Sequence, residues 1–359
     1  MNPALSRPAW RIETEQIRIS IMECGAHVAE IVLKGADEVN PLWIQDRPTI
    51  DSDQFDPDIH GALYGTGYEA RLLSGLAGHN LCFPFWGNPS LNEAQAGMTV
   101  HGETNIVRWE KLHSDPATLT IAATLLHSAI RFERTLYCEG QVVYFDETAE
   151  NLSPWDRPVG WCEHVTLGPP FLTPGLTRIG ASLTRGFRTG DHSCEFLWPQ
   201  GRGQIDCDLT TFSKRRHTDL VNSFEVNPAR EHGYFAAWHP GMGVLFGYLF
   251  SRHEFPWMNV WERNDEQRQT RGMEFSNTPV NGTMRTLFET PKIWGLPTCE
   301  WLVARGRLRK RFAAFSTVIP GDFQGVADLQ VVGDKLMIFV PGSAGPAHTI
   351  SMQSKLWQL

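Results

Sequence analysis

Apolar and polar side chains alternate over many short stretches of this chain. In residues 17–21 three isoleucines fall on one side, and Arg18 and Ser20 fall on the other, as a half-buried strand requires. Similar short runs recur along the sequence, at residues 27–33, 119–125, 130–136, 142–145, 244–250, 285–289 and 336–340. Turn-forming residues separate nearly all of these runs, so we expect each run to be a β-strand.

A sustained helical period of apolar residues is absent from the sequence. The best helical candidates are the short stretches 54–63 and 69–76. The 32 glycines and 23 prolines are spread throughout the chain and favour many brief strands joined by irregular loops. We therefore expect an all-β protein, a large antiparallel β-sandwich with one domain over residues 1–359. Within it, residues 312–359 are expected to form a C-terminal extension, either at a sheet edge or as a small appended unit.

The composition is that of a globular protein with a sizeable core. Hydrophobic residues make up 42% of the chain and charged residues 20%, which is far from the composition of a disordered protein. The formal net charge of −8 argues against a nucleic-acid partner, because phosphate recognition needs clustered Lys and Arg. The sequence has neither a recognisable export signal nor an apolar window long enough to span a bilayer. We expect a cytoplasmic protein without a membrane partner.

The seven cysteines are widely dispersed and include no Cys-x-x-Cys pair. This pattern disfavours a zinc ribbon or a disulfide framework. We expect reduced and mostly buried thiols.

Three short segments carry side chains suited to proton transfer. The segments are Val100-His101-Gly102-Glu103, Trp161-Cys162-Glu163-His164 and Gly272-Met273-Glu274, and they supply two imidazoles and a carboxylate. Such groups move protons well near neutral pH. They are far apart in the sequence, so they meet only if the fold brings them together.

The surroundings of the first segment resemble a known family. The Gly-rich, Pro-containing stretch Gly78–Pro89 is followed by the pair His101-Gly102 and then by Trp109. This order resembles the galactose mutarotase-like (aldose 1-epimerase) superfamily.

Two later matches strengthen the resemblance. Asn151 precedes the segment that begins at His164, and the stretch Phe255–Trp261 precedes Glu274. Order and approximate spacing agree with the family over about 200 residues, from His79 to Glu274.

The resemblance implies a large β-supersandwich that holds a sugar cleft on one sheet face. In this cleft Glu274 would be the general base and His164 the general acid, while His101 would hydrogen-bond a sugar hydroxyl or the ring region. Opening a cyclic hemiacetal requires removal of the anomeric hydroxyl proton and delivery of a proton to the ring oxygen. A carboxylate and an imidazolium on opposite sides of the sugar perform both transfers without a metal or a cofactor.

Further residues are expected to bind the carbohydrate. Family members commonly place an arginine near the His-Gly pair, whereas here Asn80 holds one of the nearest polar positions, and neither Arg71 nor Arg108 lies in a convincing motif. Indole faces stack on the apolar faces of sugars, so four tryptophans are candidates to line the cleft, namely Trp86, Trp161, Trp257 and Trp261.

Each of these residues, taken alone, also fits a structural role. His164 is compatible with a buried histidine bonded to a carbonyl, His101 with a turn residue, and Glu274 with a solvent-facing strand position.

Two other functions stay open beside an aldose 1-epimerase-like enzyme. The missing arginine motivates a non-catalytic carbohydrate-binding protein with the same fold. Histidines and carboxylates on neighbouring strands are also the ligands of β-barrel metalloenzymes, although the close His-x-His spacing is lacking here. The identity of the sugar, its phosphorylation and the oligomeric state are not encoded in any motif that we find.

Overall fold

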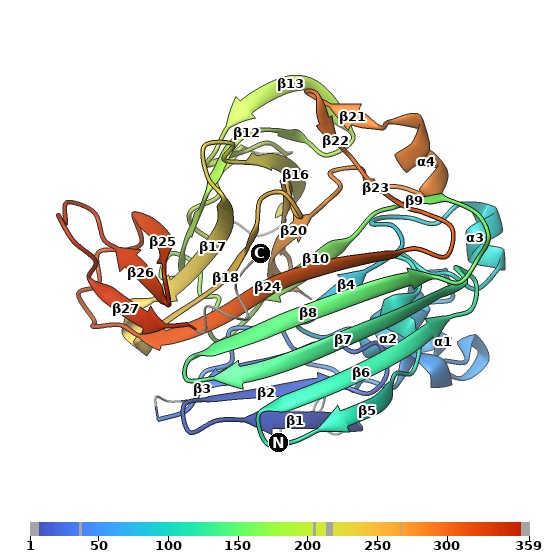
Figure 1. The fold of residues 1–359 in the computed structure, drawn as a ribbon, viewed down its shortest axis with the longest axis horizontal. Coiled ribbons are helices and arrows are strands. Elements are labelled where there is room, and N and C mark those ends of the chain that lie inside the picture. The colour runs from blue at the N-terminus through green and yellow to red at the C-terminus, as the bar shows by residue number, and fades with distance from the viewer. Residues whose placement is uncertain (1–6, 36–37, 204–205, 213–217, 267, 353–359) are drawn as a thin grey trace.

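The computed structural model describes residues 7–35, 38–203, 206–212, 218–266 and 268–352. Its main body consists of a ten-stranded and an eight-stranded sheet, and strand pairing within both is antiparallel (Figure 1). The expected all-β sandwich is confirmed.

The strands of the ten-stranded sheet are, in spatial order, β1 (Ala9–Glu13), β2 (Ile17–Met22), β3 (Val28–Leu33), β4 (His79–Cys82), β10 (Cys162–Leu167), β20 (Gln269–Ser276), β19 (Trp257–Asn264), β16 (Thr218–Val226), β12 (Leu183–Arg188) and β13 (Asp191–Leu197). Those of the eight-stranded sheet are β11 (Arg178–Ala181), β17 (His232–His239), β18 (Val244–Ser251), β24 (Arg307–Val318), β8 (Val142–Asn151), β7 (Ile130–Glu139), β6 (Thr118–Leu125) and β5 (Glu110–Ser114).

Smaller sheets pair β14 (Gln200–Gly201) with β15 (Cys207–Asp208), β21 (Lys292–Ile293) with β22 (Leu296–Pro297), β9 (Arg157–Val159) with β23 (Glu300–Leu302), and β25 (Asp328–Val332) with β26 (Lys335–Phe339) and β27 (His348–Ser351). The helices are α1 (Pro57–Tyr64), α2 (Ala70–Gly75), α3 (Leu91–Gln95) and α4 (Met284–Glu289), with 3-10 turns η2 (Ser52–Gln54), η3 (Thr104–Ile106) and η4 (Pro240–Met242).

The main core lies between the two large sheets. Phe275 of β20 stacks on Phe250 of β18, with ring centroids 4.5 Å apart, and so joins the two sheets. Both rings are fully buried, and Met273 of β20 belongs to the same core cluster. Since side chains alternate along a strand, Glu274 points to the outer face of the ten-stranded sheet.

The two short helices expected from the sequence are present. They are α1 and α2, and both lie in the long connection between β3 and β4. α1 begins with Pro57 in its first turn, and the Asp56 side chain accepts a hydrogen bond from the Asp58 backbone N–H, as a helix start requires. In Figure 1, α1, α2 and α3 gather on one side of the molecule.

One expected strand is a helix. Residues 285–289 belong to α4, where the Thr283 side chain caps the helix by accepting from the Thr286 backbone N–H. A five-residue run does not distinguish the two structures by its periodicity, and here the cap favours the helix.

The C-terminal part divides differently from the expectation. β24 lies between β18 and β8 inside the eight-stranded sheet, so the expected boundary at residue 312 falls within a central strand. The separate part begins later and is the three-stranded sheet β25–β27, which lies at one end of the molecule in Figure 1. Its Leu336 and Ile338 form a buried cluster with Leu245 and Phe315 of the large sheet.

All seven cysteines are free thiols, and Cys194 is the exposed one. Within the described ranges, no helix combines the length and the apolar character needed to cross a bilayer.

Candidate active site

A row of polar side chains crosses the middle of the ten-stranded sheet. Asn80 of β4, His164 of β10, Glu274 of β20, Asn259 of β19 and Ser223 of β16 lie directly opposite one another, each on its own strand. Directly opposite residues of a sheet share a face, so all five belong to the outer face. Strand register therefore brings His164 and Glu274 together although they are far apart in the sequence.

His164 and Glu274 are in direct contact. The distance between His164 Nε2 and Glu274 Oε1 is 3.1 Å, and His164 Nδ1 lies 3.1 Å from the hydroxyl of Thr166. The sequence analysis expected the two groups on opposite sides of a sugar. They touch instead, because they are cross-strand neighbours, and we call this pair the dyad.

Burial favours the neutral form of both members of the dyad. Burial raises the pKa of Glu274 well above its usual value, and the nearby Trp86 indole opposes this shift. Burial also lowers the pKa of His164 to about 4. The directions of both shifts favour a state in which the two groups share a single proton between a carboxyl oxygen and an imidazole nitrogen.

His101 reaches the same place from a loop. Its backbone has a positive φ of 69°, and its Nδ1 accepts a hydrogen bond from the Gly87 backbone N–H at 3.1 Å. Its ring centroid lies 5.3 Å from that of His164. Burial and His164 hold the pKa of His101 well below the usual value. Because Nδ1 accepts, the single proton of the neutral ring is on Nε2, which makes that nitrogen a donor.

A pocket of about 370 Å³ opens above the dyad. This volume lies within the range of small-molecule sites. The residues that line it are Leu72, Leu73, Leu76, Asn80, Trp86, Gly87, Asn88, Val100, His101, His164, Val221, Trp261, Arg263, Arg268, Glu274 and Asn281.

Three polar atoms of the pocket lining are buried without a hydrogen-bond partner. They are Oδ1 of Asn80, Nε1 of Trp86 and Oε2 of Glu274. A buried polar group without a partner is costly, so a ligand hydroxyl here gains most at Asn80, because the Trp86 indole and the Glu274 carboxyl already interact with each other.

Trp257 lies outside this pocket. It is fully buried, its indole N–H donates to the Pro297 carbonyl at 2.8 Å, and Trp294 and Phe187 pack around its ring. The segment that contains β21 and β22 covers it. Four residues further along the same strand, Trp261 lines the pocket instead, with its ring centroid 5.9 Å from that of His164.

The sequence analysis missed the arginines of the pocket. Arg263 lies two residues after Trp261 on β19, so both side chains are on the same face of the sheet. The alternation of side chains along this strand could therefore have identified Arg263. Arg268 lies in the turn between β19 and β20, where periodicity carries no signal. Arg108, which the sequence left open, pairs with Asp51 and Asp53, at 2.6 and 2.8 Å.

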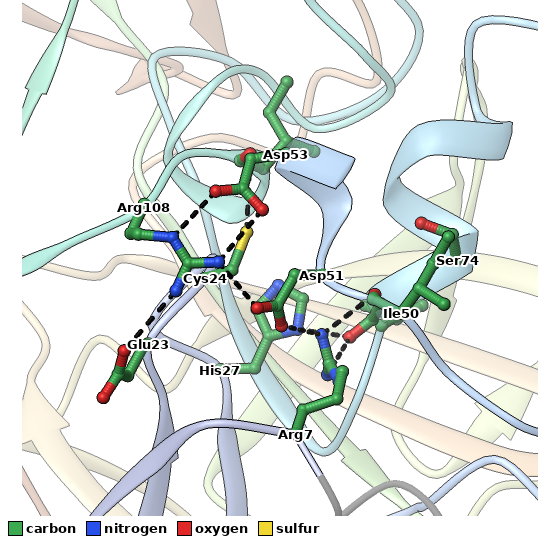
Figure 2. A network of polar contacts seen from close by, with 12 residues as sticks. Arg7, Glu23, Cys24, His27, Ile50, Asp51, Asp53, Ser74 and Arg108 are labelled. Carbon is green, nitrogen blue, oxygen red and sulfur yellow. Dashed lines mark hydrogen bonds and ion pairs between the residues drawn. The ribbon is translucent and has the colours of Figure 1, made fainter. Parts of the chain in front are cut away.

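A buried polar network holds the helix that forms one pocket wall. Figure 2 shows Arg7 beside Asp51 and the carbonyl of Ile50. Arg7 also donates to the carbonyl of Gly75, the last residue of α2, at 2.7 Å. Arg7 thus connects the N-terminal segment to the end of α2. Three leucines of the pocket lining, Leu72, Leu73 and Leu76, lie in α2 or directly after it.

No group of three or more His, Cys, Asp or Glu side chains is arranged as metal ligands would be, as far as the described residues extend.

Comparison with known proteins gives likeness in structure alone. No protein-family model and no curated protein matches the chain. A Klebsiella pneumoniae protein provisionally assigned as an aldose 1-epimerase has a TM-score of 0.63 at 12% identity, covering 86% of this chain and 78% of its own. A galactose mutarotase related enzyme from Lactobacillus acidophilus has a TM-score of 0.59 at 12% identity, covering 87% and 98%.

A third match is a galactose mutarotase-like protein from Lactobacillus casei, with a TM-score of 0.58 at 12% identity and coverage of 86% and 100%. Together with the two large sheets and their strand order, these likenesses define the architecture. The chain has the galactose mutarotase-like fold.

Proposed function

We propose that this protein is a cytoplasmic enzyme of carbohydrate metabolism that interconverts the anomers of an aldose or aldose derivative by acid/base ring opening. The observation that carries the proposal is the buried dyad of His164 and Glu274 at the base of a pocket with unpartnered polar atoms. A pair that shares one proton can accept a proton at one atom while it donates a proton at the other.

The proton transfers balance within the dyad. With the shared proton on Glu274, His164 Nε2 accepts the anomeric hydroxyl proton while the carboxyl group donates its proton to the ring oxygen. The C–O bond to the ring oxygen then breaks and an aldehyde forms. After the carbonyl rotates, the two transfers reverse and the ring closes on its other face. With the proton on His164 the roles exchange, as the sequence analysis assigned them, and the total number of protons is the same.

The remaining lining suits a sugar. The indole of Trp261 offers an apolar face, and Nε1 of Trp86 and Nε2 of His101 are donors for hydroxyl oxygens. Oδ1 of Asn80 is an acceptor for a hydroxyl hydrogen. These groups would hold the anomeric centre against the dyad.

The test is anomer exchange measured by NMR with purified protein and a panel of aldoses. We expect Glu274→Gln and His164→Asn each to reduce catalysed exchange by on the order of a hundredfold or more, because each removes one of the two proton-transfer groups. His113→Asn, at an exposed position of β5, serves as the matched control and should retain the wild-type rate. Circular dichroism and urea unfolding verify that the variants fold. Wild-type exchange rates in both dyad variants would refute the proposal.

A second function is favoured by one feature of the geometry. The two dyad groups satisfy each other at 3.1 Å, so a sugar has to displace or bridge this contact before chemistry begins. A protein that binds carbohydrate without turnover would keep the same contact. Saturable sugar binding by calorimetry, together with no catalysed exchange by NMR, would identify this second function.

A further inference from the structure

Three arginines gather where the pocket opens. Arg263 and Arg268 both line the pocket above the dyad. Arg268 also lines an adjoining cavity of about 390 Å³, and Arg47 lies on the wall of that cavity. Arg268 is therefore the wall between the two spaces. Such a concentration of positive charge is unexpected in a chain with a net charge of −8.

The three guanidinium groups differ in what they contact. Nε of Arg263 lies 2.6 Å from Asp265. Arg47 donates to the side-chain oxygen of Gln45 at 2.8 Å and to the Leu63 carbonyl at 2.9 Å, and neither acceptor is charged.

The guanidinium group of Arg268 differs from the other two in its contacts and its burial. Among the residues that the structure describes, no carboxylate lies within ion-pair distance of its guanidinium group, and its recorded hydrogen bond, to Asp265, comes from the backbone N–H. Partial burial lowers the pKa of Arg268, and the like charges of Arg263 and Arg47 lower it further, while the carboxylates of Asp265 and Asp219 oppose the shift from beyond ion-pair distance. Asp46 and Glu266 also line the adjoining cavity, but both are exposed to solvent.

We propose that the pocket selects aldoses that carry an anionic group, a phosphate or a carboxylate, and that this group binds Arg268 with the support of Arg263 and Arg47. This inference rests on the proposed function, because it places the anomeric centre of the same sugar on the dyad. The planar guanidinium fork matches the oxygens of phosphate and carboxylate, and it does so best where water is partly excluded. A neutral sugar would leave Arg268 without a partner.

The experiment measures dissociation constants by calorimetry for glucose, glucose 6-phosphate, glucuronate and inorganic phosphate. We expect the two charged sugars to bind more tightly than glucose, and Arg268→Gln to weaken the charged sugars by on the order of tenfold to a hundredfold. The affinity for glucose should change by about twofold at most, because the substitution removes a contact that glucose does not make. Comparing glucose 6-phosphate with glucuronate shows which anion the site takes, and weak binding of inorganic phosphate should also depend on Arg268.

Two further variants complete the design. Arg268→Lys keeps the charge but not the fork, and it should recover part of the affinity. Arg285→Gln is the matched control, because its side chain is 85% exposed on α4 and pairs with Glu289. This control should bind all four compounds as the wild type does.

The outcomes distinguish this inference from the proposed function. Equal affinities for glucose and the charged sugars, or affinities unchanged in Arg268→Gln, would overturn the anionic subsite even if anomer exchange persists. Arg268-dependent binding of a charged sugar whose anomers exchange no faster than in buffer would retain the subsite and overturn the enzymatic proposal.

Discussion

At the scale of single residues, Gly272 fixes the position of the dyad carboxylate. A Cβ atom at this position would lie 2.5 Å from Oε1 of Glu274 and 3.1 Å from Cβ of Trp261. The carboxylate can occupy its place beside His164 because residue 272 has no side chain. A side chain at position 272 would collide with the Glu274 carboxylate, which explains the glycine in the Gly272-Met273-Glu274 segment. The sequence alone did not reveal this steric requirement.

Gly272→Ala should displace Glu274 from His164 and lower catalysed anomer exchange by on the order of a hundredfold, since a shift of about 1 Å is costly for proton transfer. The measurement is NMR exchange with the sugar that the wild type turns over best. Gly321→Ala is a suitable control, because nothing lies within 4 Å of the added methyl group. An unchanged exchange rate in Gly272→Ala would mean that the contact between Glu274 and His164 is not needed.

At the scale of elements, the sequence predicted strands where alternation is local. The runs at 17–21 and 130–136 fall within β2 and β7. The run at 285–289 is as long as the run at 17–21, so length did not decide between the two structures, and the Thr283 cap made it a helix. The contact of His164 with Glu274 is set by the register of β10 against β20, which no local pattern encodes. The position of Arg268 in the pocket could not be predicted for a similar reason, because Arg268 lies in a turn and a turn has no periodic pattern.

The position of α2, which forms one wall of the pocket, depends on the buried carboxylate of Asp51. Asp51 contacts Arg7 at 3.3 Å and Arg108 at 2.6 Å, and its side chain is 3% exposed. Because Arg7 also donates to the carbonyl of Gly75, this carboxylate compensates the buried cation that holds the end of α2 (Figure 2). Removal of the negative charge would leave the buried Arg7 cation without its compensating charge.

Asp51→Asn should lower the free energy of unfolding by about 3 kcal/mol and weaken sugar binding, because the pocket leucines follow α2. Urea unfolding and calorimetry measure the two effects. Asp53→Asn is the matched control: Asp53 also pairs with Arg108, but its side chain is 28% exposed, so the loss should be below about 1 kcal/mol. Equal losses in the two variants would contradict the special role of the buried carboxylate.

At the scale of the whole molecule, two buried His–Glu pairs couple stability to pH. One is the dyad, and the other is His79 with Glu163, 2.7 Å apart in the core. Burial raises the pKa of both carboxyl groups above 4.5. Burial lowers the pKa of His79 to about 3 and that of His164 to about 4, from 6.5. Each folded pair therefore holds one proton over a wide pH range.

The sign of the effect follows from the protons of the unfolded chain. Between pH 4.5 and 6.5 an unfolded His–Glu pair also holds one proton, so the pairs add no slope to the stability curve there. Above pH 6.5 the unfolded pair has lost its proton, and stability falls as pH rises towards the raised pKa values of the carboxyl groups. Below pH 4.5 the unfolded pair holds two protons, and stability falls as pH decreases towards the lowered pKa values of the histidines.

We therefore expect the contribution of the dyad to stability, measured as the difference in unfolding free energy between the wild type and the double variant His164→Gln with Glu274→Gln, to be level between about pH 4.5 and 6.5 and to fall above pH 6.5 by up to about 1.4 kcal/mol per pH unit. This difference cancels the slopes of the other buried groups with shifted pKa values, such as Glu147 and His27, and on the acid side the loss ends near pH 4, where folded His164 takes up a proton as well. A double variant with the slope of the wild type above pH 6.5 would show that Glu274 is ionised in the folded state. In that case the dyad would not hold the shared proton on which the proposed ring opening depends.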